Sequence, residues 1–238
     1  MKDKVIIYTD GSSRGNPGPG GWGAVCIFPN GKVVELGNRE EMTTNNRMEL
    51  SGVLFSLREI YFRDKKGDTT VEIFADSEYV IKGITIWIYS WEKNGWKTKA
   101  NEPVLNQDLW KELSQTLRLL KILREVSFKK VAGHAGVPEN ERVDTIATMY
   151  AGNEKVLLFT GAFDIYKKMI EGEAKEKPKK SAKSSSQKAY SYVSLVAGKA
   201  TVHKTWDECK KRVEGKKSVR FKKVFSKEEE EELIKSWS

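Results

Sequence analysis

"VIIYTDGSSRGNPGPGGWGAV", residues 5–25, is the stretch that decides the fold, because an apolar run ends at Asp10 and opens into six glycines among the thirteen residues 11–23. A P-loop would need Lys followed by Ser or Thr before a helix, and a dinucleotide-binding fingerprint would need a helix next. Here the sequence continues as a strand. We interpret the segment as a hairpin connection beside Asp10, whose glycines let a bulky backbone approach closely. A plain turn, the alternative, explains Pro17 but not the density of glycine.

Two acids end two similar strand patterns. Side chains of a strand alternate, so Tyr8 and Asp10 share one face, as do Phe74 and Asp76 in "VEIFAD", residues 71–76. If the two strands are adjacent and parallel, their ends lie about 5 Å apart at the C-terminal edge of the sheet. Two carboxylates that close together need a cation.

Two further acids fall on helical patterns. Glu49 continues the apolar stripe of Val53 and Leu57, which puts an ionisable group on the face that should be buried, at a cost unless it is paired. Asp144 lies beside the apolar stripe of "ENERVDTIATMYAG", residues 139–152. Taken singly, each of the four acids has an ordinary explanation as a turn, cap or helix-dipole residue.

Taken together, the four acids indicate a metal site. Oxygen ligands from dispersed elements suit a hard cation, Mg²⁺ or alternatively Mn²⁺, whereas zinc would use His or Cys, and His134 and His203 are the only histidines. Two divalent ions about 3.5 to 4 Å apart support in-line displacement at phosphorus. The pattern therefore favours phosphoryl chemistry with two Mg²⁺ ions.

The composition indicates a polyanionic partner and no membrane. The 238 residues have a formal charge of +9, and residues 171–238 hold 18 Lys and Arg against 11 Asp and Glu, compared with 24 against 22 before them. A merely solvated basic surface is the alternative. No apolar run approaches the ~20 residues that cross a membrane, and no signal-peptide pattern is present, so a cytoplasmic protein is expected. Cys26 and Cys209 lie far apart and are interpreted as packing thiols.

The order of elements predicts an α/β domain followed by a small second domain. Strands and helices that alternate after an initial hairpin give a mixed sheet with helices packed on it. We expect strands near 4–10, 21–28, 32–41, 71–75 and 126–131, and helices near 45–62, 77–92, 104–122 and 139–152. The predicted parts are a domain at 1–153, an apolar extension at 154–170 with no assigned packing, a flexible linker at 171–189 and a β-β-α-β-α domain at 190–238.

These residues resemble the type 1 ribonuclease H domain over positions 1–152. The motifs are "YTDGSSRGNPGPGGWGAV", "TTNNRMEL", "ADSEYVIKGI", "WIYSWEKNGWKTKANEPVLNQDLW" and "VAGHAGVPENERVDTIA", in family order. The resemblance implies a five-stranded mixed sheet with an antiparallel second strand, and Mg²⁺-dependent cleavage of the RNA strand of RNA/DNA hybrids to 5′-phosphate and 3′-hydroxyl ends. It also implies that Asp10, Glu49, Asp76 and Asp144 bind metal and that His134 assists proton transfer or product departure.

The resemblance also implies substrate contacts in the first domain. Asn16, Asn45 and Asn46 match positions that contact the nucleic-acid strands, including RNA 2′-hydroxyls. A cluster of four tryptophans resembles the substrate-binding protrusion of the family: Trp87, Trp91, Trp96 and Trp110. From this protrusion, Trp87, Trp91 and Lys97 are expected to contact the substrate. The alternatives are ordinary turn and helix-start residues for the asparagines and a small apolar core for most of the indoles. Because acidic residues offset its lysines, this protrusion is less basic than the usual pattern.

Residues 190–237 resemble the small hybrid-binding domain often joined to these enzymes, through "TWDECKKRVEG", "VRFKKVF" and "SKEEEEELI". The resemblance implies aromatic contacts from Tyr192, Trp206 and Phe221, and backbone contacts from Arg220, Lys222 and Lys223. Aromatic platforms beside cations bind nucleic acid with little sequence preference. The alternative is that Trp206 and Phe221 simply form the core of a small domain.

Two other functions fit parts of the sequence. An integrase or junction resolvase shares clustered acids and Mg²⁺, but "TTNNRMEL" and "GHAGVPENERVD" resemble hybrid nucleases specifically. A non-catalytic protein that binds RNA/DNA hybrids or double-stranded RNA is the other alternative, against which the intact set of four acids counts. We expect a monomer whose partner is an RNA/DNA hybrid, with double-stranded RNA as a second candidate ligand.

Overall fold

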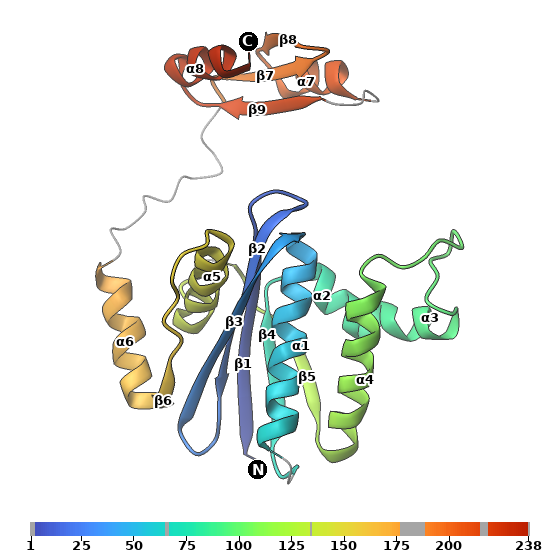
Figure 1. The fold of residues 1–238 in the computed structure, drawn as a ribbon, viewed down its shortest axis with the longest axis vertical. Coiled ribbons are helices and arrows are strands. Elements are labelled where there is room, and N and C mark those ends of the chain that lie inside the picture. Colours follow the sequence, from blue (N-terminus) through green and yellow to red (C-terminus); the bar gives the residue numbers. More distant parts are fainter. Residues whose placement is uncertain (1–2, 65–66, 134, 177–188, 215–218, 238) are drawn as a thin grey trace. The chain divides into compact units, whose positions relative to one another are not determined.

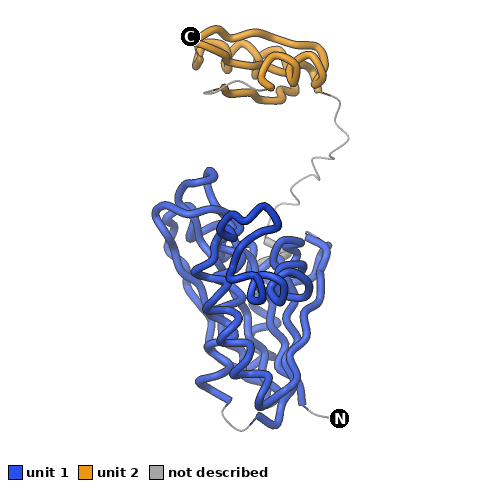
Figure 2. The backbone as a smooth tube through the Cα atoms, turned by 90° about the vertical axis from the view of Figure 1, so that its right-hand side faces the viewer, with its two compact units in different colours: residues 1–176 blue, residues 177–238 orange. Residues whose placement is uncertain are grey.

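The computed structural model describes residues 3–64, 67–133, 135–176, 189–214 and 219–237. The chain divides into two compact units, Met1–Glu176 and Lys177–Ser238 (Figure 2). The predicted linker began at residue 171, but the last helix of unit 1 continues to Glu176. The first unit therefore includes the extension after residue 153.

Unit 1 is built on a mixed sheet in the order β5-β4-β1-β2-β3-β6 (Figure 1). β1 is parallel to β4, which is parallel to β5, whereas β2, β3 and β6 each pair antiparallel with the preceding strand in this order. The strands are β1 (Lys4–Ser13), β2 (Gly18–Ile27), β3 (Lys32–Thr43), β4 (Thr70–Ala75), β5 (Val126–Lys130) and β6 (Thr160–Ala162). The five expected strands are present, and β6 corrects their number to six.

One face of the sheet is covered by α1 and α4, which share the larger apolar core. Val5 and Ile7 of β1 are buried in this core. The same cluster contains Leu54 and Leu57 of α1 and Leu113 of α4. The helices on this side are α1 (Asn45–Arg63), α2 (Glu78–Lys82), α3 (Ile88–Lys93) and α4 (Gln107–Leu123), and a π-helical turn, Gly83–Trp87, joins α2 to α3. α1 begins where Thr44, its N-cap, accepts a hydrogen bond from the Arg47 amide.

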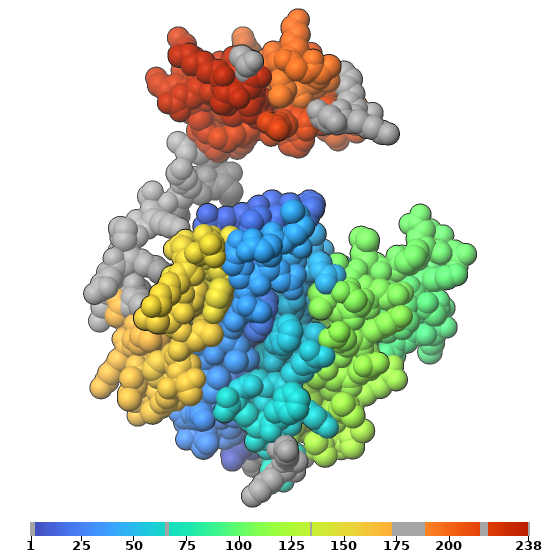
Figure 3. Space-filling model, in the orientation of Figure 1, coloured from blue at the N-terminus to red at the C-terminus, as the bar shows by residue number. Residues whose placement is uncertain are grey.

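The opposite face carries a second core built from α5 (Pro138–Ala151) and the extension. Val25 and Val33 of the sheet and Val143 of α5 are buried together with Tyr166 and Ile170. The last two belong to α6 (Phe163–Glu176), which follows β6. In the space-filling view the extension, coloured yellow to orange, lies directly beside the blue strands (Figure 3). The packing of 154–170, which the sequence left open, is thus along the β3 edge and beside α5.

Two glycines of the opening stretch allow helices to lie directly on the sheet. A Cβ at Gly11 would collide with the backbone nitrogen of Glu49, and a Cβ at Gly23 would lie 2.7 Å from the carbonyl oxygen of Val143. The prediction that the glycines permit close backbone approach is therefore confirmed. The backbones that approach are those of α1 and α5.

Unit 2 is a three-stranded antiparallel sheet in the order β8-β7-β9 with two helices. Its elements follow the expected β-β-α-β-α order: β7 (Ser191–Val196), β8 (Lys199–His203), α7 (Trp206–Val213), β9 (Arg220–Val224) and α8 (Lys227–Trp237). Among its described residues, Val193, Cys209, Val213 and Val224 are the buried apolar ones. Cys209 and Cys26 are both free and buried, as the packing interpretation predicts. Within the described ranges, no helix combines the length and apolarity needed to span a membrane.

Candidate active site

Asp10 and Asp76 are brought side by side by two parallel strands. Tyr8 pairs with Phe74, and Thr9 with Ala75, between β1 and β4. The next residues along the two segments are Asp10 and Asp76. The rings of Tyr8 and Phe74 are stacked with their centroids 5.0 Å apart, which shows that the alternate positions ending in Asp10 and Asp76 project to one face. The predicted adjacency of the two strands is confirmed.

Glu49 reaches the same edge from α1. Gly11 follows Asp10 directly, and its missing side chain leaves room for the Glu49 backbone. The Glu49 carboxylate accepts hydrogen bonds from Asn45 Nδ2, at 2.8 Å, and from Ser77 Oγ. Ser77 follows Asp76 and is also the N-cap of α2, so one side chain links the end of β4 to Glu49.

Asp144 comes from the other side of the sheet, on α5. Val143 before it is buried, and Gly23 lets this turn of the helix lie on β2. Thr148 Oγ1, one turn later, donates to Asp144 Oδ1 at 3.4 Å. Asp144 is half-buried at the rim of this packing.

The electrostatics of Asp10 show that the four acids lie near one another. Burial and, after it, the negative charges of Asp76, Asp144 and Glu49 raise the pKa of Asp10 to about 8. The Gly11 amide, which donates to Asp10 Oδ1 at 2.7 Å, opposes the shift. Burial and the charge of Asp76 likewise raise the pKa of Glu49 against its two hydrogen bonds.

The donor set fits a divalent cation by its chemistry. The clustered side chains are carboxylates, the ligands that Mg²⁺ and Mn²⁺ prefer, and a cation between them would offset the repulsion that raises the Asp10 pKa. Within the part of the chain that the structure describes, no three His, Cys, Asp or Glu side chains are arranged to hold a metal ion. The four acids therefore lie close enough to interact electrostatically, but their side chains are not arranged in the coordination geometry of a bound metal ion.

His134 lies outside the described residues. The residue before it is placed: a Cβ at Gly133 would lie 2.9 Å from Asp76 Oδ2. Gly133 therefore lies directly beside one of the four acids.

The three asparagines differ in their surroundings. Asn16 and Asn46 are exposed, whereas Asn45 is half-buried with its amide donated to Glu49. The structure thus gives Asn45 a role beside the acids, and the nucleic-acid contacts of all three stay predictions.

The tryptophans separate into a core member and half-buried members. Trp110 is fully buried, and its Nε1 donates to the Tyr79 hydroxyl at 2.9 Å. Trp91 packs against both Trp110 and Trp87, with ring centroids 5.4 and 5.7 Å away, and Trp87 and Trp91 remain partly exposed. Lys97 is exposed. The core interpretation therefore holds for Trp110, and Trp91 and Trp96 pack against the same core while staying partly exposed. Substrate contacts by Trp87, Trp91 and Lys97 stay predictions.

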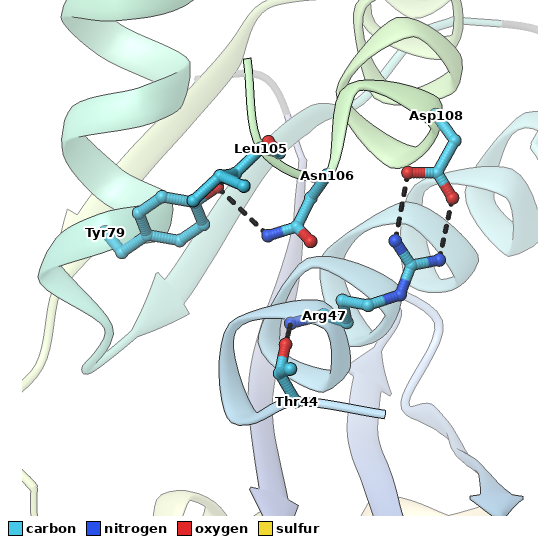
Figure 4. Close-up of polar contacts among 6 residues, drawn as sticks. All are labelled: Thr44, Arg47, Tyr79, Leu105, Asn106 and Asp108. Atoms are coloured by element: carbon cyan, nitrogen blue, oxygen red, sulfur yellow. Dashed lines mark hydrogen bonds and ion pairs between the residues drawn. The ribbon is translucent and has the colours of Figure 1, made fainter. Parts of the chain in front are cut away.

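An ion pair joins the start of α1 to the start of α4 beside this aromatic cluster. The two Arg47 Nη atoms lie 3.0 and 2.7 Å from the two carboxylate oxygens of Asp108 (Figure 4). These hydrogen bonds hold the pKa of Asp108 below its usual range. Next to the pair, Asn106 Nδ2 donates to the Tyr79 hydroxyl at 3.2 Å. The helix start that carries Asn45 and Glu49 is thereby tied to the predicted protrusion.

Unit 2 presents aromatic rings on its surface. Trp206 is 39% exposed and Phe221 52%, so the alternative that they form the core of the unit is contradicted. The Trp206 ring centroid lies 5.7 Å from that of Tyr192 and 5.3 Å from that of Phe221. The register pairs Tyr192 with Lys223 and Ser194 with Phe221, which places Lys223 on the same face as the rings.

The predicted cations of unit 2 are divided between the two faces of its sheet. Side chains alternate along β9, so Arg220 and Lys222 project away from the face of Phe221 and Lys223. Lys222 Nζ lies 3.2 Å from a carboxylate oxygen of Glu229 in α8. Tyr192, Trp206, Phe221 and Lys223 therefore share one face, which we call the aromatic face, and the nucleic-acid contacts of all six residues, Arg220 and Lys222 included, stay predictions.

Sequence reasoning missed how two residues of the acid site, Gly11 and Ser77, support Glu49. The position of Gly11 is a recognisable sequence signal, because this glycine directly follows Asp10, the acid that ends the strand pattern, and precedes the polar loop. The position of Ser77 is another, since a Ser after a strand and before "EYVIK" is a typical helix N-cap. Neither signal predicts that both residues serve Glu49.

Comparison with known proteins identifies close relatives of unit 1. The family described as RNase H matches residues 2–151. Ribonuclease H of Thermosynechococcus vestitus is 46% identical over 154 residues, which are 65% of this chain and 92% of the relative. Ribonuclease H of Pseudomonas savastanoi pv. phaseolicola is 47% identical over 147 residues, 62% of this chain and 92% of the relative.

A solved structure agrees with these relatives. The crystal structure of LC9-RNase H1, described as a type 1 RNase H with the type 2 active-site motif, superposes with a TM-score of 0.60 and 29% sequence identity. The superposition covers 73% of this chain and 85% of that chain.

Proposed function

Because the chain belongs to the ribonuclease H family, we propose that it is an endonuclease that hydrolyses the RNA strand of RNA/DNA hybrids in a Mg²⁺-dependent reaction. The observation that carries the proposal is the placement of four acids around one edge of the sheet, where burial and three further carboxylates, from the residue after β4, from α1 and from α5, raise the pKa of Asp10. Such a cluster is costly in a structural role and useful where a cation must be held.

Each acid has a place in this proposal. Asp10 would bind from β1 and Asp76 from the residue that follows β4, while Glu49 and Asp144 would bind from helices on opposite faces. When bound, two Mg²⁺ ions would activate the attacking water and stabilise the leaving 3′ oxygen, which gives 5′-phosphate and 3′-hydroxyl ends. Ser77 and Asn45 orient the Glu49 carboxylate by their hydrogen bonds. His134, beside Gly133, is proposed to move a proton or to aid product departure.

Unit 2 is proposed to hold the same hybrid through its aromatic face. Exposed rings beside a lysine can stack on bases without reading their sequence. Such a module joined to the nuclease raises the local concentration of substrate without adding contacts in unit 1.

A substrate panel tests the proposal. End-labelled RNA/DNA hybrid, double-stranded RNA and single-stranded RNA are each incubated with the protein in Mg²⁺, in Mn²⁺ or in EDTA, and the product ends are identified. We expect cleavage only of the RNA in the hybrid, with 5′-phosphate ends, and none in EDTA. Hybrid binding without cleavage in either metal would instead support the non-catalytic binding protein, and cleavage of single-stranded RNA would contradict the hybrid specificity.

A further inference from the structure

The predicted extension 154–170 continues as α6 to Glu176, and we now use the name extension for residues 154–176; it lies beyond the segment 2–151 that the family matches, yet it is built into the sheet and core of unit 1. We propose that the extension is a positioning element for Asp144: it completes a buried ion pair between Arg142 and Glu35 that fixes α5 on the sheet. This inference rests on the proposed metal-binding role of Asp144.

The ion pair joins the helix of Asp144 to β3. Arg142 Nε lies 2.7 Å from Glu35 Oε1 and Arg142 Nη2 lies 2.9 Å from Glu35 Oε2, so the contact is bidentate. The side chains are 8% and 0% exposed. A buried pair of this kind is stable only when its remaining hydrogen-bonding groups are also satisfied.

The extension supplies a hydrogen bond to each member of the pair. The Phe159 amide donates to Glu35 Oε2 at 2.9 Å, and Arg142 Nη2 donates to the Leu157 carbonyl at 3.1 Å. The Glu35 amide in turn donates to the Phe159 carbonyl at 2.8 Å. Without residues 157–159, both members of the pair would lose partners that water in a buried site cannot easily replace.

Apolar packing fixes the same turn of α5. Val143, between Arg142 and Asp144, is buried in the core that includes Tyr166 and Ile170 of α6. The far end of α5 is also tied to β3, because Arg39 Nη1 donates to the carbonyls of Tyr150 and Ala151 at 3.2 and 3.3 Å. A shift of Asp144 relative to β1 would therefore break the ion pair and open this core.

The test measures Mg²⁺ binding directly in the full-length protein. Amide chemical shifts of Asp10 and Asp144 are followed by NMR as Mg²⁺ is added to wild type and to Arg142→Met, without nucleic acid. Removing a partner that orients a metal ligand costs roughly 10- to 100-fold in metal affinity. We expect the Mg²⁺ concentration at half-saturation to rise by at least about 10-fold, in line with that range.

Arg124→Met is the matched control. Arg124 is another buried arginine paired with an acid, Asp64, but it follows α4 and precedes β5, near the ends of the strands away from the acids. Both substitutions should lower thermal stability. Only Arg142→Met should weaken Mg²⁺ binding, and Arg142→Lys, which keeps a charge for Glu35, should recover part of the loss.

Tyr166→Ala tests the extension without replacing either member of the ion pair, and serves if Arg142→Met does not fold. Metal-free hydrogen exchange of the amides of residues 143–147 should accelerate in Tyr166→Ala and not in Arg124→Met. The positioning role would be overturned if Arg142→Met and Tyr166→Ala lost as much thermal stability as Arg124→Met but still bound Mg²⁺ with the midpoint of wild type. If wild type itself showed no Mg²⁺-dependent shifts at Asp10 or Asp144, the proposed function would fail instead, and the exchange rates would still decide whether the extension holds α5.

Discussion

The raised pKa of Asp10 is the clearest electrostatic evidence for the proposed metal site. Its carboxylate is half-buried, burial and three nearby negative charges raise its pKa, and the Gly11 amide opposes that rise without cancelling it. The same field that makes ionisation of Asp10 unfavourable makes a bound cation favourable. Asp10 therefore couples protonation, metal binding and stability.

The raised pKa of Asp10 predicts how stability depends on pH. Between its ordinary value of 3.8 and about 8, the folded protein keeps a proton that the unfolded chain has released. Stability from this group is therefore complete below the lower value and lost as the pH rises through the upper one. In EDTA, melting temperatures should increasingly favour Asp10→Asn over wild type as the pH rises from 5 to 9.

Mg²⁺ provides the internal control for that experiment. It should raise the melting temperature of wild type and leave that of Asp10→Asn nearly unchanged, because ligand binding stabilises only the state that binds it. A difference between the two proteins that stayed constant with pH would refute the coupled field at Asp10.

The acids were predictable from sequence, whereas their supporting residues were not. Alternation along two strands placed Asp10 beside Asp76, and a helical stripe placed Glu49 on a buried face. The pairing of Glu35 with Arg142 joins residues 107 positions apart, and nothing in either local pattern specifies the partner. Contacts of that kind follow from the packing of whole elements, which a single sequence does not encode locally.

At the scale of elements, the long periodic segments were predicted and the short strand was not. The helices near 45–62 and 139–152 and the strands near 4–10 and 71–75 appear at the expected positions. β6 has only three residues, "TGA", and no alternation of its own. It is a strand because the edge of β3 offers it hydrogen-bonding partners from Lys32 to Val34.

Gly172 in α6 gives a stability prediction for the extension. It lies within a helix and has open space where the Cβ of a larger residue would lie, so replacement by Ala should add about 0.5 to 1 kcal/mol by reducing backbone entropy in the unfolded chain. The expected rise in melting temperature is about 1 to 4 °C.

Gly31→Ala is the control for that prediction. Gly31 also has open space at its Cβ position, but its φ of +76° is strained for any other residue, so this variant should be less stable by about 1 to 2 kcal/mol. Equal effects of the two substitutions would mean that α6 is not helical at Gly172 in solution.

The aromatic face of unit 2 gives a binding prediction. Trp206→Ala should weaken binding of an RNA/DNA hybrid by about 1 to 3 kcal/mol, because it removes the central ring between Tyr192 and Phe221. Fluorescence anisotropy with a labelled hybrid in EDTA measures this without cleavage.

Lys222 and Lys223 form a matched pair for the same assay. They are adjacent and equal in charge, but only Lys223 projects from the aromatic face. Lys223→Ala should therefore weaken binding more than Lys222→Ala and reduce the salt dependence more. An unchanged affinity in a folded Trp206→Ala variant would contradict the assignment of this face.

At the scale of the whole molecule, unit 1 is proposed to cleave the RNA and unit 2 to bind the hybrid. Deleting residues 177–238 should leave cleavage intact but reduce the number of cuts per binding event, because the substrate loses its second attachment. A single-turnover assay with excess unlabelled hybrid as a trap counts those cuts. The deletion has to begin after Glu176, since α6 belongs to the core of unit 1.

The result of that deletion separates two accounts of unit 2. Fewer cuts with an unchanged rate of chemistry would support tethering. An unchanged number of cuts would show that unit 2 does not hold the hybrid during the reaction.

The most direct test of the central claim compares wild type and Asp10→Asn on one end-labelled RNA/DNA hybrid, measuring cleavage in Mg²⁺ and binding in EDTA. Asn keeps the shape of the side chain but removes a charged ligand, so the variant should bind the hybrid like wild type and leave its RNA uncut. Retained cleavage by Asp10→Asn would remove Asp10 from the metal site and contradict the account of the four acids.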